Sequence, residues 1–463
     1  FYCDKSGGSS SSSLLVGSNG KGGRNSNSSS SSRDSKDSRA LDELDTYAMD
    51  VKRGFQRRMA SSSDSEFGRR KASDSGYAAR VCQFGADSGA HSSPVTHNIR
   101  SDAKNVNRYN ADTRGEWCNR SEGKVLILAT VHDTFPKPLQ TQCLWMSFDT
   151  LETALDFRRT VCLDNAQDLP ISMEYMDRDT FDVVDRSGRV MANLLRIGGT
   201  NSSLLSLLWS IKGCIESLPF ENAALLCDTW LHWVNDFFPS ILPERFMRMG
   251  RSKDHHVALT IGDFGNGEMD RILGRIDQFT KTRGGEKVTL DKCHTQEEEL
   301  AVTAFRFVIA PAFRTWCVGE GVQGFSIDYA LPKSGGGVPP LPHDRGKSGM
   351  NDKQTKKENA TIHHKDLSLP PPVALKRLRY SHFGCNVVHE DVAYMLGVDT
   401  HAVKMQLKHA VEDVCGGKLP AEHGHGMEYT APNNTKERWM QMDPLNVMNP
   451  GIGGLSSKYR YKE

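Results

Sequence analysis

The sequence lacks the features that would place it in several common protein classes. Its eleven cysteines are scattered and include no C-x-x-C pair, which argues against a zinc knuckle or a disulfide framework and predicts reduced thiols. It has no run of about 18 apolar residues and no visible signal peptide, so we expect no transmembrane helix. Its formal net charge is only +1, so no global field points to nucleic acid.

Apolar residues are also scarce, and the shortage is local. They make up 37% of the 463 residues, a length that suits two or three domains. Ser6–Ser75 is dominated by Ser, Gly, Asn, Arg and Asp, and it cannot bury enough apolar surface to offset its ordering entropy. We interpret this part as disordered insertions, with a phosphorylated or RNA-binding tail as the alternative. Because the chain begins at Phe1, we expect a fragment or an incomplete gene product.

Strand and helix patterns alternate after residue 107, which predicts an α/β or α+β body. The Gly-rich turn at 262–267 follows a strand but lacks G-x-G-x-x-G spacing, so we expect a structural turn rather than a phosphate-binding loop. Residues 332–372 are rich in Gly, Pro, Lys and Asp and predict a linker. The apolar patterns predict strands at 123–131, 144–148, 171–176 and 256–261, and helices at 150–161, from 177–181 onward, at 268–279 and at 401–414.

Two histidine-bearing segments near the C-terminus point to chemistry. One is SHFGCNVVHE at 381–390, and the other is PAEHGHG at 420–426; DPLNVMNPGIG at 443–453 follows them. Histidine exchanges a proton near neutral pH and is the commonest metal ligand. Several histidines beside an acid, in otherwise apolar segments, are typical of an active-site wall.

Taken in order, these segments resemble the FAD-dependent, quinone-linked D-lactate dehydrogenases, which are peripheral membrane enzymes of the vanillyl-alcohol-oxidase type. The family's H-x6-H spacing is matched by His382 and His389, and its E-H-G segment by Glu422 to Gly424. The glycine-rich pyrophosphate loops that open the family's FAD domain have no counterpart here. The other matching segments are RYNAD at 108–112, GK at 123–124, DTF at 133–135, EYMDRD at 174–179, HH at 255–256 and the turn at 262–268.

The resemblance implies an α+β fold, in which a remnant of the FAD-binding domain precedes a ferredoxin-like-type cap domain of mixed sheet and helices, with a membrane-associating segment. The implied organisation is listed by residue number: largely disordered Ser-rich insertions at 1–106, the end of the FAD domain at 107–137, the first cap segment at 138–280, a membrane-associating and linker segment at 281–372, and a C-terminal cap segment with the active-site histidines at 373–463.

The resemblance also implies roles for the histidines. His423 is the first candidate for the base that takes the hydroxyl proton, His389 is the second, and His382 completes the catalytic set. Glu422 is a substrate-binding candidate. A structural histidine in the core is the alternative for each ring. His382, His389 and Glu422 could also bind a divalent metal, but Phe383 replaces the residues that metal-binding relatives carry, so we predict no metal.

Three further residues complete the predicted site. Gly123 and Ile127 lie on the strand whose backbone faces the flavin in the family, so they are the predicted cofactor contacts. Arg178 is a candidate carboxylate clamp, although a salt bridge with a neighbouring acid is the alternative.

The predicted function is oxidation of D-lactate to pyruvate, with hydride transfer to FAD and electrons passed to a membrane quinone. Two alternatives stay open: oxidation of another D-2-hydroxy acid, and a non-catalytic remnant that binds a membrane or a partner. The predicted location is the cytoplasmic face of the plasma membrane or the inner mitochondrial membrane, against an anionic surface. An aromatic segment with nearby arginines, Phe237–Leu242 with Arg245, Arg248 and Arg251, is one candidate for that contact, and Trp209 and Trp233 are others.

Overall fold

The computed structural model describes residues 121–127, 137–164, 168–198, 203–219, 222–283, 287–332, 338–341 and 372–461. The chain divides into two compact units, and of the smaller one only Leu126 and Ile127 are described. The helices and strands given below belong to the larger unit. The predicted disordered insertions and most of the predicted 332–372 linker lie outside the described residues.

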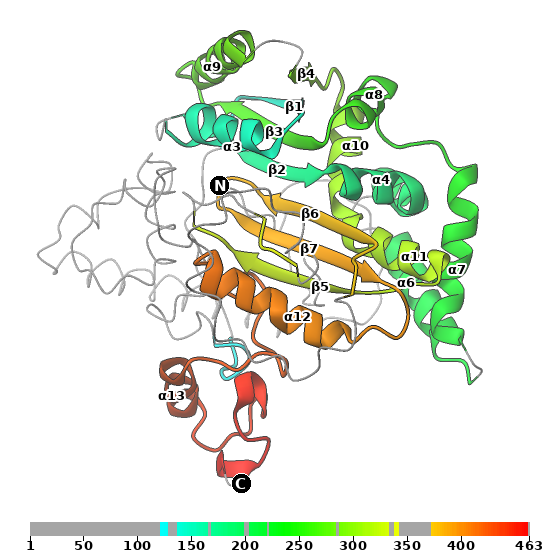
Figure 1. Ribbon diagram of the computed structural model, residues 1–463, viewed down its shortest axis with the longest axis vertical. Coiled ribbons are helices and arrows are strands. Elements are labelled where there is room, and N and C mark those ends of the chain that lie inside the picture. Colours follow the sequence, from blue (N-terminus) through cyan, green and yellow to red (C-terminus); the bar gives the residue numbers. More distant parts are fainter. Residues whose placement is uncertain are drawn as a thin grey trace, which may run out of the picture. The chain divides into compact units, whose positions relative to one another are not determined.

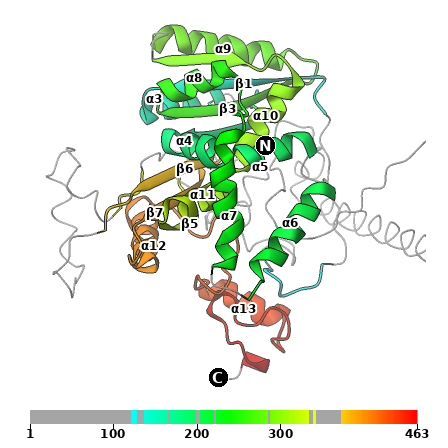
Figure 2. The same cartoon turned by 90° about the vertical axis from the view of Figure 1, so that its right-hand side faces the viewer.

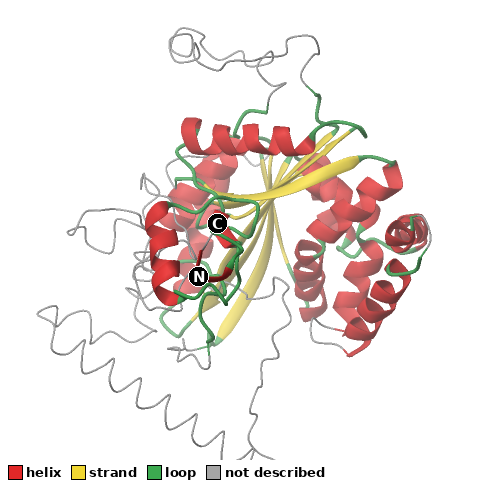
Figure 3. Ribbon diagram, turned by 90° about the horizontal axis from the view of Figure 1, so that it is seen from below, coloured by secondary structure: helices red, strands yellow, loops and turns green. Residues whose placement is uncertain are grey.

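One seven-stranded sheet organises the larger unit, in the order β4-β1-β3-β2-β6-β7-β5. Every pair of neighbouring strands in it is antiparallel. With helices on both sides of this sheet, the fold is α+β, as predicted (Figure 3). The strands are β1 (Gln140–Phe148), β2 (Ser172–Asp177), β3 (His255–Asp263), β4 (Val288–Lys292), β5 (Gln323–Ala330), β6 (Lys376–His382) and β7 (Val387–Tyr394).

The largest apolar core lies on one face of the sheet, under a group of helices. Trp145 is fully buried at its centre and is ringed by Phe181, Phe246 and Phe305. Figure 2 shows these helices beside the strands. They are α4 (Arg178–Ser187), α5 (Arg189–Gly198), α8 (Glu244–Ser252), α10 (Gln296–Phe307) and α11 (Ile309–Glu320), and α6 (Ser203–Glu216), α7 (Ala223–Val234) and η3 (Asn235–Phe237) continue this layer.

The opposite face is covered in two parts. Phe148 of β1 packs on Phe157, which in turn contacts Phe279. At the other end, Tyr329 and Val388 share a core with Leu407. Figure 1 shows α12 running along β5 and β7. The covering elements are α3 (Leu151–Phe157), η2 (Arg158–Leu163) and α9 (Glu268–Arg283) on the first part, and α12 (Thr400–His409) with η5 (Ala410–Val414) on the second.

The C-terminal segment folds around the short stretch 121–125. The Lys124 ammonium is buried and contacts Asp443 at 3.3 Å and the side-chain oxygen of Asn446 at 2.6 Å. Trp439 is fully buried in a small core with Ile452. This segment contains α13 (Asn433–Met442), η6 (Ile452–Gly454) and η7 (Tyr459–Tyr461).

Most predicted elements are present, and their ends follow local rules. Thr150 and Asp177 cap α3 and α4, where their side-chain oxygens accept backbone N–H groups. The strand predicted at 123–131 is not formed in the described residues. Gly123–Ile127 forms a turn and irregular chain, and 128–131 lies outside the described residues. An apolar run forms a strand only where neighbouring strands pair with it, and no such partner occurs in the described residues.

Candidate functional site

Polar side chains form a row across four adjacent strands of the sheet. Glu174 on β2 lies opposite His382 on β6, and Asp328 on β5 lies opposite His389 on β7. The two histidines are diagonal neighbours with ring centroids 5.4 Å apart. Because side chains alternate along a strand, this register places all four on the face that carries the main core.

The loop 420–426 crosses this row and adds two more functional side chains. Asp328 holds the start of the loop: its Oδ2 accepts the backbone N–H groups of Ala421, Glu422 and His423 at 2.9, 2.8 and 3.3 Å. Its Oδ1 contacts His423 Nδ1 at 3.2 Å. The Asp328 side chain is 10% exposed and that of His423 is 67% exposed. One buried carboxylate therefore fixes both the loop and the orientation of the exposed imidazole.

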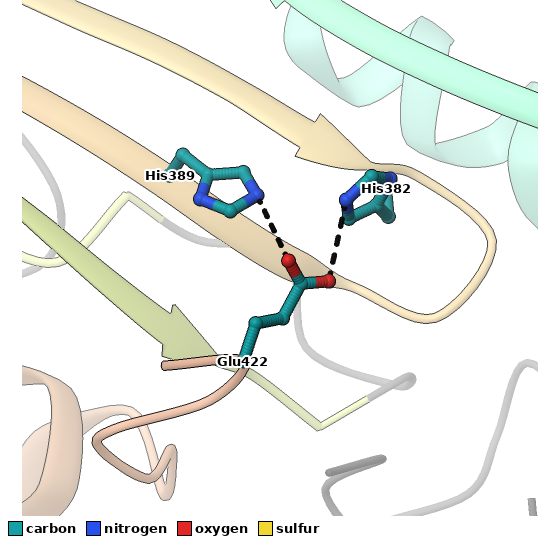
Figure 4. Close-up of side chains that lie close together, drawn as sticks. All are labelled: His382, His389 and Glu422. Carbon is teal, nitrogen blue, oxygen red and sulfur yellow. Dashed lines mark ion pairs between the residues drawn. The ribbon is translucent and has the colours of Figure 1, made fainter. Parts of the chain in front are cut away.

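Glu422 joins the two strand histidines, as Figure 4 shows. Its Oε1 lies 3.2 Å from His382 Nε2, and its Oε2 lies 3.5 Å from His389 Nε2. All three side chains are largely buried. The structure thus brings together a carboxylate and two imidazoles from β6, β7 and the loop.

The charges in this cluster form an alternating chain. Arg306 of α10 donates to Glu174 at 2.9 Å, and Glu174 contacts His382 Nδ1 at 2.9 Å. Burial lowers the pKa of His382, but the carboxylates of Glu174 and Glu422 outweigh it and raise that pKa to about 9. Burial holds the pKa of His389 well below its usual range, and nearby cations add to that effect. At neutral pH, His382 is therefore an imidazolium and His389 a neutral imidazole.

The far end of the loop is held by a second carboxylate. Glu122 Oε2 accepts the backbone N–H of His425 at 2.7 Å, and its Oε1 contacts His425 Nδ1 at 2.9 Å. Both side chains are buried. The next residue, Gly123, has φ +86°, and an added Cβ would lie 3.0 Å from Asn449 Nδ2. The stretch 121–125 therefore lies against the loop.

Four of the predicted site residues meet in this cluster: His382, His389, Glu422 and His423. Arg178 does not join them. It follows β2, four residues beyond Glu174 and so about 13 Å further along the chain. Its Nε contacts both carboxylate oxygens of Asp182, at 2.9 and 3.0 Å, which is a local salt bridge of the kind we gave as the alternative, with a different acid.

Sequence reasoning did not single out three members of the site. Asp328, Glu174 and Arg306 come from β5, β2 and α10, far along the chain from the histidine segments. Glu174 stood inside a matched segment, EYMDRD, but only the β2–β6 pairing gives it a partner. No local signal marked Asp328 or Arg306, because their importance arises from register and packing.

A metal ion is a second way to use the same side chains. His382, His389 and Glu422 offer ligand atoms that lie within 4.8 Å of one another. Three protein ligands with an open position are typical of a catalytic divalent ion. The absence of a bound metal stays a prediction, because the same three side chains also form ion pairs with one another.

The predicted turn at 262–267 is a structural turn. Glu268 Oε2 accepts the backbone N–H groups of Phe264 and Asn266, both at 3.1 Å, and Asp263 accepts that of Gly265 at 2.6 Å. These N–H groups are the donors that a phosphate would need. Acidic side chains occupy them instead.

A stripe of apolar side chains is exposed along α7 and η3. Leu226, Trp230, Trp233 and Phe237, at positions i, i+4, i+7 and i+11, are 49, 58, 66 and 74% exposed. Among the described helices, none is by itself long and apolar enough to cross a membrane; α10 and α11 pass that test only as a pair bent by 56°.

Comparisons with known proteins agree on one family. The family model "D-lactate dehydrogenase, membrane binding" matches residues 143–352 and 365–461. The quinone-dependent D-lactate dehydrogenase of Escherichia coli is 28% identical over 386 residues, covering 81% of this chain and 61% of that protein. The enzyme of the same name from Corynebacterium glutamicum is 26% identical, covering 75% and 57%. The chain thus spans about three fifths of the length of these relatives.

Among solved structures, p-cresol methylhydroxylase with substrate bound matches with a TM-score of 0.35 and 11% identity, covering 70% of this chain and 54% of that one.

Proposed function

This chain belongs to the membrane-binding D-lactate dehydrogenase family, and from that premise we propose that it oxidises D-lactate to pyruvate and passes the electrons to a membrane quinone. The observation that carries the proposal is the His423–Asp328 pair beside the His382–Glu422–His389 cluster. In this arrangement an exposed imidazole, which a buried carboxylate orients, lies beside a cluster of side chains whose charges balance one another.

His423 is the base in this proposal. Asp328 holds Nδ1, so Nε2 is the nitrogen that can take the proton from the substrate hydroxyl. An aspartate behind a histidine fixes its tautomer and stabilises the imidazolium that forms, as in hydrolase triads. His389 is the second candidate, but its lowered pKa makes it a weaker base than an ordinary imidazole, which favours His423.

The cationic His382 has an electrostatic role. Its two ring nitrogens face Glu174 and Glu422, so it cannot clamp a substrate carboxylate with a free N–H group. Instead it cancels the charge of Glu422, which would otherwise repel an anionic substrate. Glu422 stays a predicted substrate-binding residue, and with its charge balanced it can lie beside an anionic substrate while His423 takes the hydroxyl proton.

FAD is the proposed cofactor. The exposed ring of His423 could face the flavin. Gly123 stays a predicted backbone contact, because 121–125 lies against the loop that carries His423, although the Asn449 side chain fills the space that a Cβ of Gly123 would take. FAD would supply the hydride acceptor for C2 of the substrate. Ile127, in the smaller unit, remains a predicted cofactor contact.

The test is FAD-reconstituted protein assayed for reduction of a soluble quinone analogue by D-lactate, after treatment with EDTA. We expect turnover in the wild type and a loss of about 100-fold or more in His423→Asn. His409→Asn, which changes an exposed histidine on α12, is the matched control and should retain activity. Full activity in His423→Asn would contradict the role of this ring. Activity that returns only when a divalent ion is added would favour the metal alternative.

Another D-2-hydroxy acid remains the alternative substrate, because the proposed chemistry acts at the hydroxyl-bearing carbon and is the same for any substrate side chain. Competition between D-lactate and a bulkier D-2-hydroxy acid decides between them. A higher kcat/KM for the bulkier acid would replace lactate in the proposal and leave the chemistry unchanged.

We further propose that the α7 stripe attaches the protein to the membrane surface. Exposed tryptophans suit the interface between headgroups and acyl chains. Arg245 and Arg251, which the sequence suggested as contacts with anionic lipid, are already paired with Glu298 and Asp185. We therefore expect vesicle binding to depend more on Trp230 and Trp233 than on lipid charge. Strong binding to anionic vesicles alone would contradict this.

A further inference from the structure

We propose that Glu122 is a positioning residue, which holds the loop 420–426 in a fixed position against the stretch 121–125. The inference rests on the proposed function, because it concerns the loop that carries Glu422 and His423. It assigns to the side chain before Gly123 a task that neither the sequence nor the family comparison indicates.

The loop 420–426 has no helix or strand of its own, and two carboxylates hold it. Asp328 binds the backbone N–H groups of residues 421–423. Glu122 binds the backbone N–H and the ring of His425. Glu422 and His423 therefore lie between the two anchors. Buried carboxylates that accept several N–H groups make strong, directional contacts, so each anchor limits how far the loop can move.

The fit at the Glu122 anchor is tight. At Gly424, an added Cβ would lie 2.8 Å from Glu122 Oε2 and 3.1 Å from its carboxyl carbon. Ring and backbone contacts with His425 keep the carboxylate in that place. Gly424 thus lets the loop approach the carboxylate closely, and a larger residue there would have to push the Glu122 carboxylate away from its contacts with His425.

The backbone of Glu122 is itself held in an uncommon conformation. Its φ is +47°, in the left-handed region that residues other than glycine rarely adopt. The Asn449 side chain donates a hydrogen bond of 2.6 Å to its carbonyl oxygen. Such strain persists only where the surroundings fix it. Here it aims the Glu122 side chain at the loop while Gly123, the proposed flavin contact, follows directly in the chain.

The experiment compares three variants with a control. The variants are Glu122→Ala, Gly424→Ala and the double variant that carries both changes, and the control is Lys124→Met. Lys124→Met breaks the neighbouring buried contacts with Asp443 without touching the loop, so it controls for loss of stability. Hydrogen exchange measured by mass spectrometry on 420–426 reports loop position without requiring flavin or activity. Steady-state kinetics with D-lactate then separate kcat from KM.

We expect Glu122→Ala to speed exchange in the loop about tenfold and to lower kcat about 10- to 100-fold, with KM changed less than about threefold. Gly424→Ala should act similarly. The double variant should be no worse than Glu122→Ala, because the atoms that the new Cβ would meet are gone. Lys124→Met should leave loop exchange near the wild-type rate.

Loop exchange in Glu122→Ala that equals that of Lys124→Met would overturn the inference, as would strictly additive effects in the double variant. If the wild type fails to oxidise D-lactate, the proposed function fails, while the exchange data still decide whether Glu122 holds the loop.

Discussion

Replacing Glu174 by glutamine should release His382 from the charge that keeps it protonated. Glu174 contacts one ring nitrogen at 2.9 Å and Glu422 contacts the other at 3.2 Å. Against burial, these carboxylates raise the pKa of His382 from 6.5 to about 9. A difference of that size corresponds to about 3 kcal/mol in favour of the imidazolium.

The direction of the pH effect follows from a folded pKa that lies above the unfolded one. The stabilisation of the folded protein by the His382 imidazolium is complete below about pH 6.5. It is lost as the pH rises through about 9. In Glu174→Gln we expect the pKa of His382 to fall by about one to two pH units, because only Glu422 remains beside it. The difference in unfolding free energy between the two proteins should be largest near pH 6 and should narrow toward alkaline pH.

The assay is an NMR titration of ¹³C-labelled histidines in EDTA-treated protein, with His382→Asn to assign the signal. Arg306→Gln is the matched control: it removes the other partner of Glu174 and leaves the carboxylate, so His382 should stay protonated at neutral pH. A wild-type His382 that titrates near its ordinary value, or one that Glu174→Gln leaves unmoved, would refute the reasoning.

Four other variants each test one feature of the structure. Asp328→Asn removes the charge that orients the catalytic histidine, so kcat should fall about 100-fold or more, with little change in thermal unfolding temperature. A fall in kcat that comes with a large drop in unfolding temperature would indicate a purely structural role. In Gly250→Ala the new Cβ would lie 2.2 Å from a phenylalanine ring, so unfolding free energy should fall by about 1–3 kcal/mol. Gly274→Ala, in open space on α9, should instead raise it by about 0.5–1 kcal/mol, as thermal denaturation would show. Trp230→Ser with Trp233→Ser should weaken sedimentation with neutral vesicles at least about tenfold and leave turnover of a soluble quinone analogue unchanged; unchanged sedimentation would exclude the stripe as the attachment site.

Local patterns in the sequence were enough to predict helices and strands whose ends and buried faces are set by neighbouring residues. The helix at 150–161 and the strand at 256–261 follow from apolar spacing and turn residues, and both are confirmed as α3 with η2 and as β3. The four residues of the histidine cluster were named from their motifs. The structure brings these four side chains together, whereas their place beside a flavin and their chemical roles stay predictions.

The site residues that the sequence did not predict are those brought in by contacts between distant parts of the chain. Asp328 lies 95 residues before His423, and only the pairing of β5 with β7 brings it to the site. Glu122 lies 303 residues before His425. Arg178 shows the opposite case, because its partner Asp182 is one helical turn away and competes with any distant carboxylate.

The most direct test of the account is the flavin absorbance spectrum of the FAD-loaded protein before and after D-lactate is added without oxygen, using the longer gene product if coding sequence continues upstream of Phe1. The account predicts that the flavin band bleaches with D-lactate, does not bleach with L-lactate, and bleaches far more slowly in His423→Asn. A loaded wild-type protein whose flavin D-lactate leaves oxidised would contradict the proposed dehydrogenase function.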